Sequence, residues 1–361
     1  MARWGDYFGG RHSDFRTPHV VSGLANVVAI DASNSSNYAL ECAGGVSSCP
    51  TDGIVMAWGD GAVGQLGDGS NHSPHNQPVQ VHFPSGVNIV SIGEARDEGF
   101  AIDSTGQGWG WGLNGHGSLC IGNTTKQSVP VAIPGLTSVT AVQGGQDHVL
   151  WLLANGTVMA CGANNYGQLG TGRTRASNVP TAVRQLTDVV QITAGNTTSG
   201  ALDSSGNVYM WGYNRRGQVG IGSGDQGSIS TPTKVTLPLP AVQLSSGGDI
   251  IGNGHSLAIL NDGSVYAWGD DANGQLGDGQ TFDKFSPVQV TVPAGVTFTN
   301  VAAGGCFSLA LDTNGYVYSW GCGQRGQLGV AGMSQSTSPI EVDSGVGMIS
   351  ATANNALDFH S

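Results

Sequence analysis

The sequence predicts an all-β protein, a seven-bladed β-propeller built from four-stranded antiparallel blades. A glycine-rich motif recurs along the chain at steps of 50 to 57 residues, and apolar residues alternate with polar ones between its copies. Repeats of this length are typical of propellers and solenoids, in which one supersecondary unit stacks against its copies. A third observation, the complementary patterns at the two chain ends, predicts how the ring closes.

The repeated motif is clearest at 268–279, WGDDANGQLGDG. Matching segments begin at Trp58, Trp111, Cys161, Trp211 and Trp320, and a degraded copy begins at Trp4. The chain has 59 glycines but only 14 prolines, and the glycines keep fixed offsets in each repeat, which indicates turn residues. We expect the repeated Trp to fill the core. The apolar residue after the motif's Gln is expected to plug the space between blades; it is Leu66, Leu119, Leu169, Val219, Leu276 or Leu328.

Residues 298–344 show the four strands expected in one blade. FTNVAAGG is an apolar strand a, CFSLALD alternates as strand b, YVYSWG is strand c, and the Pro-containing SPIEVD is strand d. The turn DTNG joins strands b and c, and Asp/Asn-Gly turns supply the positive φ that tight hairpins need. The same turn recurs in each repeat, so the sequence predicts a repeated four-stranded meander, which is a propeller blade.

The two ends of the chain complement each other. Residues 346–359 match strands a and b, and residues 2–5 match strand c. A seventh blade of two C-terminal and two N-terminal strands would tie the ring shut and remove exposed sheet edges. We therefore expect a single domain over 1–361, with blades at 26–85, 86–136, 137–187, 188–239, 240–293, 294–344, and 345–361 plus 1–25.

Composition argues against several classes of function. Charged residues make up 11% of the chain and the net charge is −12, so direct nucleic-acid binding is not expected. No apolar run is long enough to span a bilayer, and the N-terminus MARWGDYFGG lacks the apolar core of a secretory signal. Three routes stay open: the chain stays in the cytoplasm, a signal has been removed, or the chain leaves by another route such as a virus particle.

The six cysteines leave the redox compartment open. Cys42 and Cys49 flank a short loop at a spacing that suits a disulfide, and Cys306 and Cys322 lie at two strand ends on the same edge of one repeat. The alternative is that all six are free thiols at small apolar positions. Disulfides would favour an extracellular or virion-associated protein.

The run HSLAI at 255–259, followed by DGSVYAWG at 262–269 and NGQLGDG at 273–279, resembles the repeat of the regulator of chromosome condensation family. The resemblance covers essentially the full chain. It implies a propeller that offers a rim and two faces to a protein partner. Members of that family include an exchange factor for the GTPase Ran, a plant ultraviolet-B photoreceptor, modules of ubiquitin ligases and a secreted β-lactamase inhibitor.

This chain departs from several of those members. It starts almost directly at Trp4, without the basic tail expected of the exchange factors, and its tryptophans fall about one per repeat rather than in a chromophore-like cluster. The inhibitor has shorter repeats without the GQLG signature. We expect a non-enzymatic scaffold that binds a protein partner. One alternative is a structural or receptor-binding part of an extracellular assembly, such as a virion or surface fibre, and a second is a guanine-nucleotide exchange factor.

Catalytic, cofactor and metal sites are not expected. Neither a G-x-S-x-G nucleophile motif nor a phosphate loop occurs in the sequence. His72, His75 and His82 lie in a polar loop without a cysteine or carboxylate at ligand spacing. We expect His148 and His255 to be packed or hydrogen-bonded, and the charged run 96–98 to form a solvated face.

The predicted partner-binding surface comes from repeats that differ in length. Residues 249–254 lengthen an a–b loop, and residues 223–231 lengthen the region after the preceding repeat's motif. In a meander these loops emerge on one face, so we expect a single raised patch, because loops on a rigid scaffold commonly carry binding. Neutral drift is the alternative. The predicted contact residues are Asp249, Ile250, Ile251, Asn253, Arg215, Arg216, Asp225 and Gln226.

Overall fold

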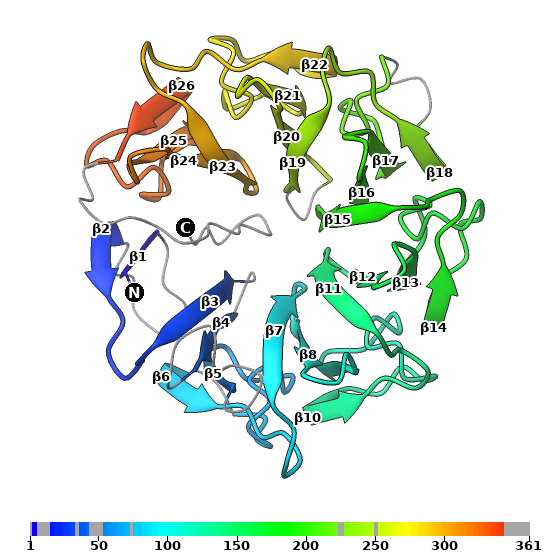
Figure 1. Ribbon diagram of the computed structural model, residues 1–361. Coiled ribbons are helices and arrows are strands. Elements are labelled where there is room, and N and C mark those ends of the chain that lie inside the picture. The colour runs from blue at the N-terminus through cyan, green and yellow to red at the C-terminus, as the bar shows by residue number, and fades with distance from the viewer. Residues whose placement is uncertain are drawn as a thin grey trace.

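The computed structural model describes residues 2–5, 15–32, 36–42, 53–72, 75–222, 227–248 and 252–342. Within these ranges every regular element is a β-strand. Six four-stranded antiparallel sheets follow one another, and each hydrogen-bonds its strands in chain order. They stand around a ring, with strand a of each blade towards the centre and strand d at the rim (Figure 1). The prediction of an all-β propeller with four-stranded blades is confirmed.

The strands have the following bounds. Strand a of each blade is β3 (Val27–Ala32), β7 (Ile89–Glu94), β11 (Val139–Gly144), β15 (Val189–Ala194), β19 (Ala241–Ser246) or β23 (Phe298–Ala303). Strand b is β4 (Ser36–Glu41), β8 (Glu98–Asp103), β12 (His148–Leu153), β16 (Thr198–Asp203), β20 (His255–Leu260) or β24 (Phe307–Asp312). Strand c is β5 (Ile54–Gly59), β9 (Gly108–Gly112), β13 (Val158–Gly162), β17 (Val208–Tyr213), β21 (Val265–Gly269) or β25 (Val317–Cys322). Strand d is β6 (His75–Gln80), β10 (Gln127–Ala132), β14 (Ser177–Ala182), β18 (Ser228–Lys234), β22 (Lys284–Gln289) or β26 (Gln335–Glu341).

The predicted count of seven four-stranded blades is wrong for the described residues, which form six. They also form a two-stranded sheet of β1 (Ala2–Gly5) and β2 (Phe15–Val20), which lies between the last blade and the first in Figure 1. Within the described ranges this sheet contains those two strands alone. The sequence predicts its other two strands at 346–359, and those residues lie outside the described part of the chain.

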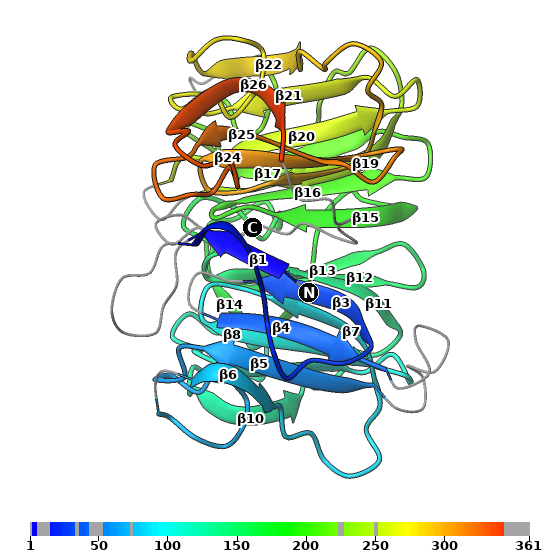
Figure 2. The same ribbon diagram turned by 90° about the vertical axis from the view of Figure 1, so that its left-hand side faces the viewer.

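The register places the a–b and c–d loops on one face. In the β19–β22 blade, the first residue of strand b, His255, pairs with the last residue of strand c, Gly269, and Gly269 pairs with Lys284 at the start of strand d. The loops therefore leave the blades on two opposite sides (Figure 2). We call the side with the a–b and c–d loops the loop face, and the side with the b–c turns the turn face.

Neighbouring blades are joined by the repeated motif. The indole nitrogen of Trp211 on β17 donates a 2.8 Å hydrogen bond to the carbonyl oxygen of Gln168 in the preceding blade, and the hydroxyl of Ser199 donates to the same oxygen at 2.8 Å. The ring of His148 contacts that hydroxyl at 2.9 Å. Indole donors at three other boundaries repeat the first bond at 2.8 to 3.0 Å: Trp111, Trp268 and Trp320. The indole thus fills core and satisfies a buried carbonyl.

The glycine after the plug residue makes room for the indole. A Cβ on Gly277 would lie 2.7 Å from the indole nitrogen of Trp320, and Gly277 has a φ of +73°. The plug residues of all six motifs are fully buried, as predicted. His148 and His255 are buried, and burial lowers the pKa of each imidazole, to about 4 for His148 and about 3 for His255. The expectation that they are packed or hydrogen-bonded is confirmed.

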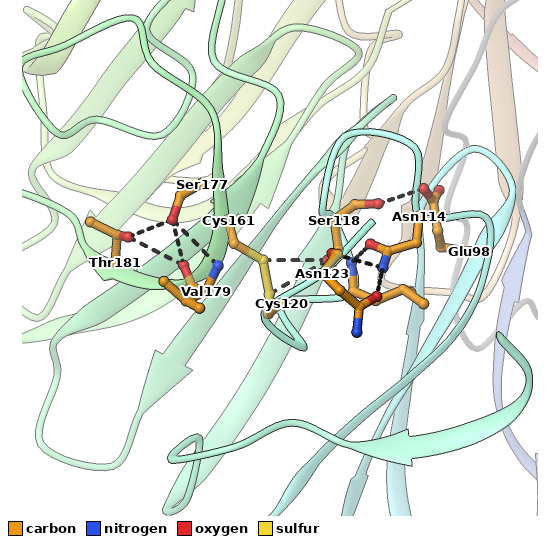
Figure 3. The surroundings of a disulfide bond; sticks show 10 residues. Glu98, Asn114, Ser118, Cys120, Asn123, Cys161, Ser177, Val179 and Thr181 are labelled. Carbon is orange, nitrogen blue, oxygen red and sulfur yellow. Dashed lines mark hydrogen bonds between the residues drawn. A yellow bond between two sulfur atoms is a disulfide. The ribbon is translucent and has the colours of Figure 1, made fainter. Parts of the chain in front are cut away.

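The boundary between the β7–β10 and β11–β14 blades is built differently. Cys161 takes the tryptophan position and Cys120 takes the glycine position with a φ of +59°, and the two form a disulfide with a Cα–Cα distance of 5.7 Å (Figure 3). The Sγ atom of Cys161 lies 3.3 Å from the carbonyl oxygen of Ser118. At the four boundaries described above, the indole nitrogen of a tryptophan occupies this place. Trp151 on strand b is fully buried and packs edge-on against Phe100. A covalent bond and a relocated indole therefore replace the usual contact.

Glu98 is also buried at this boundary, so the expectation of a solvated face over 96–98 is wrong for this residue. Burial raises the pKa of its carboxyl group to about 8, although a 2.6 Å hydrogen bond from Ser118 opposes the rise. Glu98 takes the place that His148 and His255 take in their blades, at the first residue of strand b. The first residue of strand b is buried in each of the six described blades, whichever residue occupies it.

An asparagine side chain shapes the c–d loop. The amide nitrogen of Asn164 donates 2.9 Å hydrogen bonds to the carbonyl oxygens of Arg173 and Arg175, and its amide oxygen accepts from the backbone of Leu169. Asn114 makes the same kinds of contact in the preceding blade. One amide therefore holds both ends of the loop.

Asp271 takes the asparagine position in the β19–β22 blade. Its Oδ1 atom accepts from the backbone of Leu276 at 2.9 Å, but its buried Oδ2 atom has no hydrogen-bond partner among the described residues. Burial raises the pKa of this carboxyl group to about 7. A protonated carboxyl can donate where the amide nitrogen donates in the other blades, and a carboxylate cannot.

Gly277→Ala and Gly279→Ala are a matched pair that tests the blade contact. Both glycines have positive φ, but only at Gly277 would a Cβ meet the indole of Trp320; nothing lies within 4 Å of a Cβ at Gly279. We expect Gly279→Ala to lower the free energy of unfolding by about 1 kcal/mol, and Gly277→Ala by about 3 kcal/mol. Urea unfolding followed by tryptophan fluorescence measures both. Equal losses would show that the indole does not depend on this glycine.

Asp271→Asn is expected to stabilise the protein by about 1 to 3 kcal/mol at pH 8. The amide nitrogen of asparagine would replace the unpartnered Oδ2 atom with an uncharged hydrogen-bond donor. The folded state raises the pKa of Asp271 from 3.8 to about 7, so it holds the proton more tightly than the unfolded chain does. The stabilisation of the folded state by the protonated Asp271 carboxyl group is complete below pH 4 and is lost as the pH rises to 7. Urea unfolding at pH 4, 6 and 8 measures the gain, which should be small at pH 4. A gain that does not change with pH would contradict this role.

Candidate protein-binding surface on the loop face

Arg215 and Arg216 lie in the c–d loop of the β15–β18 blade. The side-chain oxygen of Gln218 accepts a 2.8 Å hydrogen bond from the backbone nitrogen of Arg216, which fixes the loop beside the blade boundary. The guanidinium of Arg216 reaches the next blade, 3.0 Å from an oxygen of Asp283 and 3.7 Å from one of Asp270. The hydrogen bond to Asp283 raises the pKa of Arg216 above its usual value. The Arg216 side chain remains 46% exposed, so a partner can reach it.

Where it is described, the predicted insertion at 249–254 contacts the end of strand c and the c–d loop of the preceding blade, whereas the described part of the other insertion, from Ser228 on, belongs to β18. The side-chain nitrogen of Gln218 donates a 2.8 Å hydrogen bond to the carbonyl oxygen of Gly252, across the boundary between two blades. A Cβ on Gly252 would lie 3.2 Å from the ring of Tyr213, so these segments are in direct contact. Asn253 is half-buried beside them. Asp249, Ile250, Ile251, Asp225 and Gln226 lie outside the described residues.

Three aromatic residues of this face are absent from the predicted site. The rings of Tyr166 and Tyr213 meet edge-on with centroids 4.8 Å apart; Tyr166 lies in the c–d loop of one blade and Tyr213 ends strand c of the next. Tyr166 is 40% exposed and Phe282, next to Asp283, is 72% exposed. We define the loop-face patch as Tyr166, Tyr213, Arg215, Arg216 and Phe282.

The sequence contains a signal that would have found these aromatic residues. In the tract between the motif's first glycine and its GQLG turn, Tyr166 and Tyr213 stand where the β19–β22 repeat has Asn273 and Asp270. The position of Tyr166 is exposed or half-buried in each of the six described blades, so a large side chain there has no core to fill. Repeat length alone does not reveal such residues, because Tyr166 belongs to a repeat without an insertion.

The described cysteines are in disulfides. Cys306 and Cys322 are bonded within one blade, with a Cα–Cα distance of 5.6 Å, and Cys42 is disulfide-bonded as well. Cys49, the partner predicted for Cys42, lies outside the described residues. The Cys120–Cys161 bond was not predicted from the sequence.

The described ranges hold neither a metal cluster nor a membrane-spanning helix. They contain no group of three or more His, Cys, Asp or Glu side chains placed to hold a metal ion. Of the three histidines that the sequence places in a polar loop, His75 begins β6 and lies 3.8 Å from Asp68. None of the described residues belongs to a helix long and apolar enough to cross a membrane.

Curated relatives match part of this chain. A mitochondrial RCC1 domain-containing protein of Arabidopsis thaliana, RUG3, is 36% identical over 118 residues, which are 32% of this chain and 25% of RUG3. The probable E3 ubiquitin-protein ligase HERC3 of Homo sapiens is 41% identical over 92 residues, which are 25% of this chain and 9% of HERC3. The ultraviolet-B receptor UVR8 of Arabidopsis thaliana is 37% identical over 26% of this chain and 21% of its own length. The chain therefore spans a quarter or less of these relatives.

Solved structures share the fold over nearly the whole chain. Prp20p of Saccharomyces cerevisiae matches with a TM-score of 0.84 and 22% identity, covering 99% of this chain and 90% of that one. Human WBSCR16 matches with a TM-score of 0.83 and 18% identity, covering 97% and 90%. The family model for the regulator of chromosome condensation (RCC1) repeat matches residues 52–94, 105–152, 155–202, 205–259, 262–311 and 314–353. The chain belongs to the RCC1 repeat family.

Proposed function

We propose that this chain is a non-enzymatic protein-interaction scaffold that binds a protein partner through the loop-face patch. The observation that supports this most is the exposed aromatic and arginine side chains gathered across three blades on one face. Tyrosine and arginine dominate binding energy at protein interfaces, because each combines a large contact area with a polar group. The ion pair of Arg216 with Asp283 and the hydrogen bond between Gln218 and Gly252 hold the surface in place, which lowers the entropy cost of binding.

The combined variant Tyr166→Ala/Arg216→Ala tests the proposal, with Tyr316→Ala as its matched control. Tyr316 is 49% exposed and lies in a b–c turn, so it belongs to the turn face. Each immobilised protein is incubated with an extract of the source organism, and the retained proteins are quantified by mass spectrometry. We expect the combined variant to retain the main partner at least about tenfold less than the unaltered protein, and the control to retain it fully. Equal retention by all three would refute the role of the patch.

The retained partner also tests the exchange-factor alternative. If it is a small GTPase, release of a fluorescent guanine nucleotide from that GTPase should accelerate when the propeller is added. Prp20p of Saccharomyces cerevisiae, which shares the fold, binds Gsp1p and histones. For this chain, exchange activity is a proposal that needs that measurement.

A specific observation favours the extracellular-assembly alternative. Disulfides persist in oxidising surroundings and are rare in the cytosol. The structure has a disulfide across a blade boundary and another within a blade. Thiol titration of the denatured protein, isolated from its native source under alkylation, tests this reading. Oxidised Cys120 and Cys161 would support an extracellular or virion-associated component, and six titratable thiols would contradict it.

A further inference from the structure

An open hollow of about 620 Å³ lies beside the loop-face patch at the boundary that carries the inter-blade disulfide. Arg173, Arg175 and Arg184 of the β11–β14 blade line it together with His116, which comes from the c–d loop of the preceding blade. We call this hollow the arginine groove. Arg173 and Arg175 lie in the same c–d loop as Tyr166, but none of the five patch residues lines the groove.

The arginine groove concentrates positive charge in an acidic protein. The chain has 13 Lys and Arg residues against 25 Asp and Glu, and three of those 13 line this one hollow. Among the described residues, no carboxylate lies within 4.0 Å of these three guanidinium groups. By contrast, Arg216 has two carboxylates within that distance. Asp147 lies 3.4 Å from His116 at the edge of the groove, but the three arginines outnumber this carboxylate, so the groove has an excess of positive charge in a molecule of net charge −12.

The backbone that presents the arginines is held on several sides. Asn164 donates to the carbonyl oxygens of both Arg173 and Arg175, and the backbone nitrogen of Arg184 donates to Gly170 at 3.1 Å. The guanidinium of Arg184 lies over Gly172, where a Cβ would be 3.1 Å from its Nη1 atom. The backbone that carries the three arginines is thus fixed before any ligand arrives, so binding has to order only their side chains.

The two blades that form the groove cannot separate easily. The backbone nitrogen of Gly122 donates a 2.8 Å hydrogen bond to the carbonyl oxygen of Asn178 on β14, and the Cys120–Cys161 disulfide crosses the same boundary. In Figure 3 the disulfide lies between Ser177 and Thr181 on one side and Ser118 on the other. Ser177 and Thr181 also line the groove and pair with Gly162 and Ala160, the two neighbours of Cys161 on β13, so the covalent bond lies close to the groove wall.

We propose that the arginine groove binds the phosphate group of a phosphorylated serine or threonine in a partner protein. Arginine forks match phosphate oxygens in bidentate pairs, and arginine clusters are a recurring means of phosphopeptide recognition. Three uncompensated guanidinium groups suit a compact dianion with three acceptor oxygens better than a single carboxylate. A long polyanion such as nucleic acid would meet the acidic remainder of the surface. This inference rests on the proposed scaffold function and names the chemistry of the partner.

Fluorescence anisotropy with a degenerate peptide library tests the groove directly. The labelled probe has a fixed phosphoserine flanked on each side by three randomised positions, and matched libraries carry serine or glutamate at the fixed position. We expect the phosphoserine library to bind at least about tenfold more tightly than either matched library. Arg175→Gln and Arg184→Gln should each weaken it about tenfold, the loss typical of one charge-assisted hydrogen bond. Arg325→Gln, in the c–d loop of another blade, is the control and should bind as the unaltered protein does.

Three results would overturn the proposal. Equal affinity for the phosphoserine and serine libraries would show that the groove does not recognise phosphate, and equal affinity for the glutamate library would reduce it to general charge attraction. Tighter binding of a single-stranded DNA oligonucleotide than of the phosphoserine library would assign the groove to nucleic acid. Tyr166→Ala/Arg216→Ala should bind the phosphoserine library normally while retaining less partner. Failure of the groove and failure of the patch are therefore distinguishable.

Discussion

The hydrogen bond from one tryptophan indole to the glutamine carbonyl of the preceding blade is the contact on which the ring depends. A single four-stranded blade has two faces to bury and cannot bury them alone, so each blade needs its neighbour. The indole covers the apolar plug, satisfies a buried carbonyl and requires a glycine beneath it. This interface therefore dictates the spacing of Trp, Gln, Leu or Val, and Gly at the four boundaries where the indole bond is described.

The disulfide boundary shows which parts of that interface can change. Cys161 and Cys120 replace the indole and the glycine, Ser118 replaces the glutamine, and Trp151 fills the interior from strand b. The glycine position keeps its left-handed backbone even with a side chain, because the turn, rather than the residue, sets that conformation. The boundary with the most altered chemistry is also the one beside the arginine groove.

The sequence predicts the fold because the residues that recur in each repeat are the ones that form the contact between neighbouring blades. The four strands, the buried plugs and the packed histidines all follow from alternation and turn chemistry. The number of complete blades among the described residues did not follow, because pairing between chain ends is a non-local event that a local pattern only suggests. The Cys120–Cys161 pair was missed because its partners lie 41 residues apart, and only the contact between the Trp and Gly positions makes them neighbours. Exposed aromatic residues were missed because loop length, rather than loop composition, guided the choice of site.

The loop face unites two kinds of surface on one rigid support. The patch offers aromatic rings and a partly neutralised arginine, whereas the groove offers uncompensated guanidinium groups. Hydrogen–deuterium exchange of the protein with and without its bound partner is the most direct test that this face does the binding. We expect new protection confined to the c–d loops with their adjoining strand ends, at 163–177, 213–222 and 278–284, and to the a–b loop at 252–254. Protection at the b–c turns instead, at 203–207, 260–264 or 312–316, would contradict binding by the loop face.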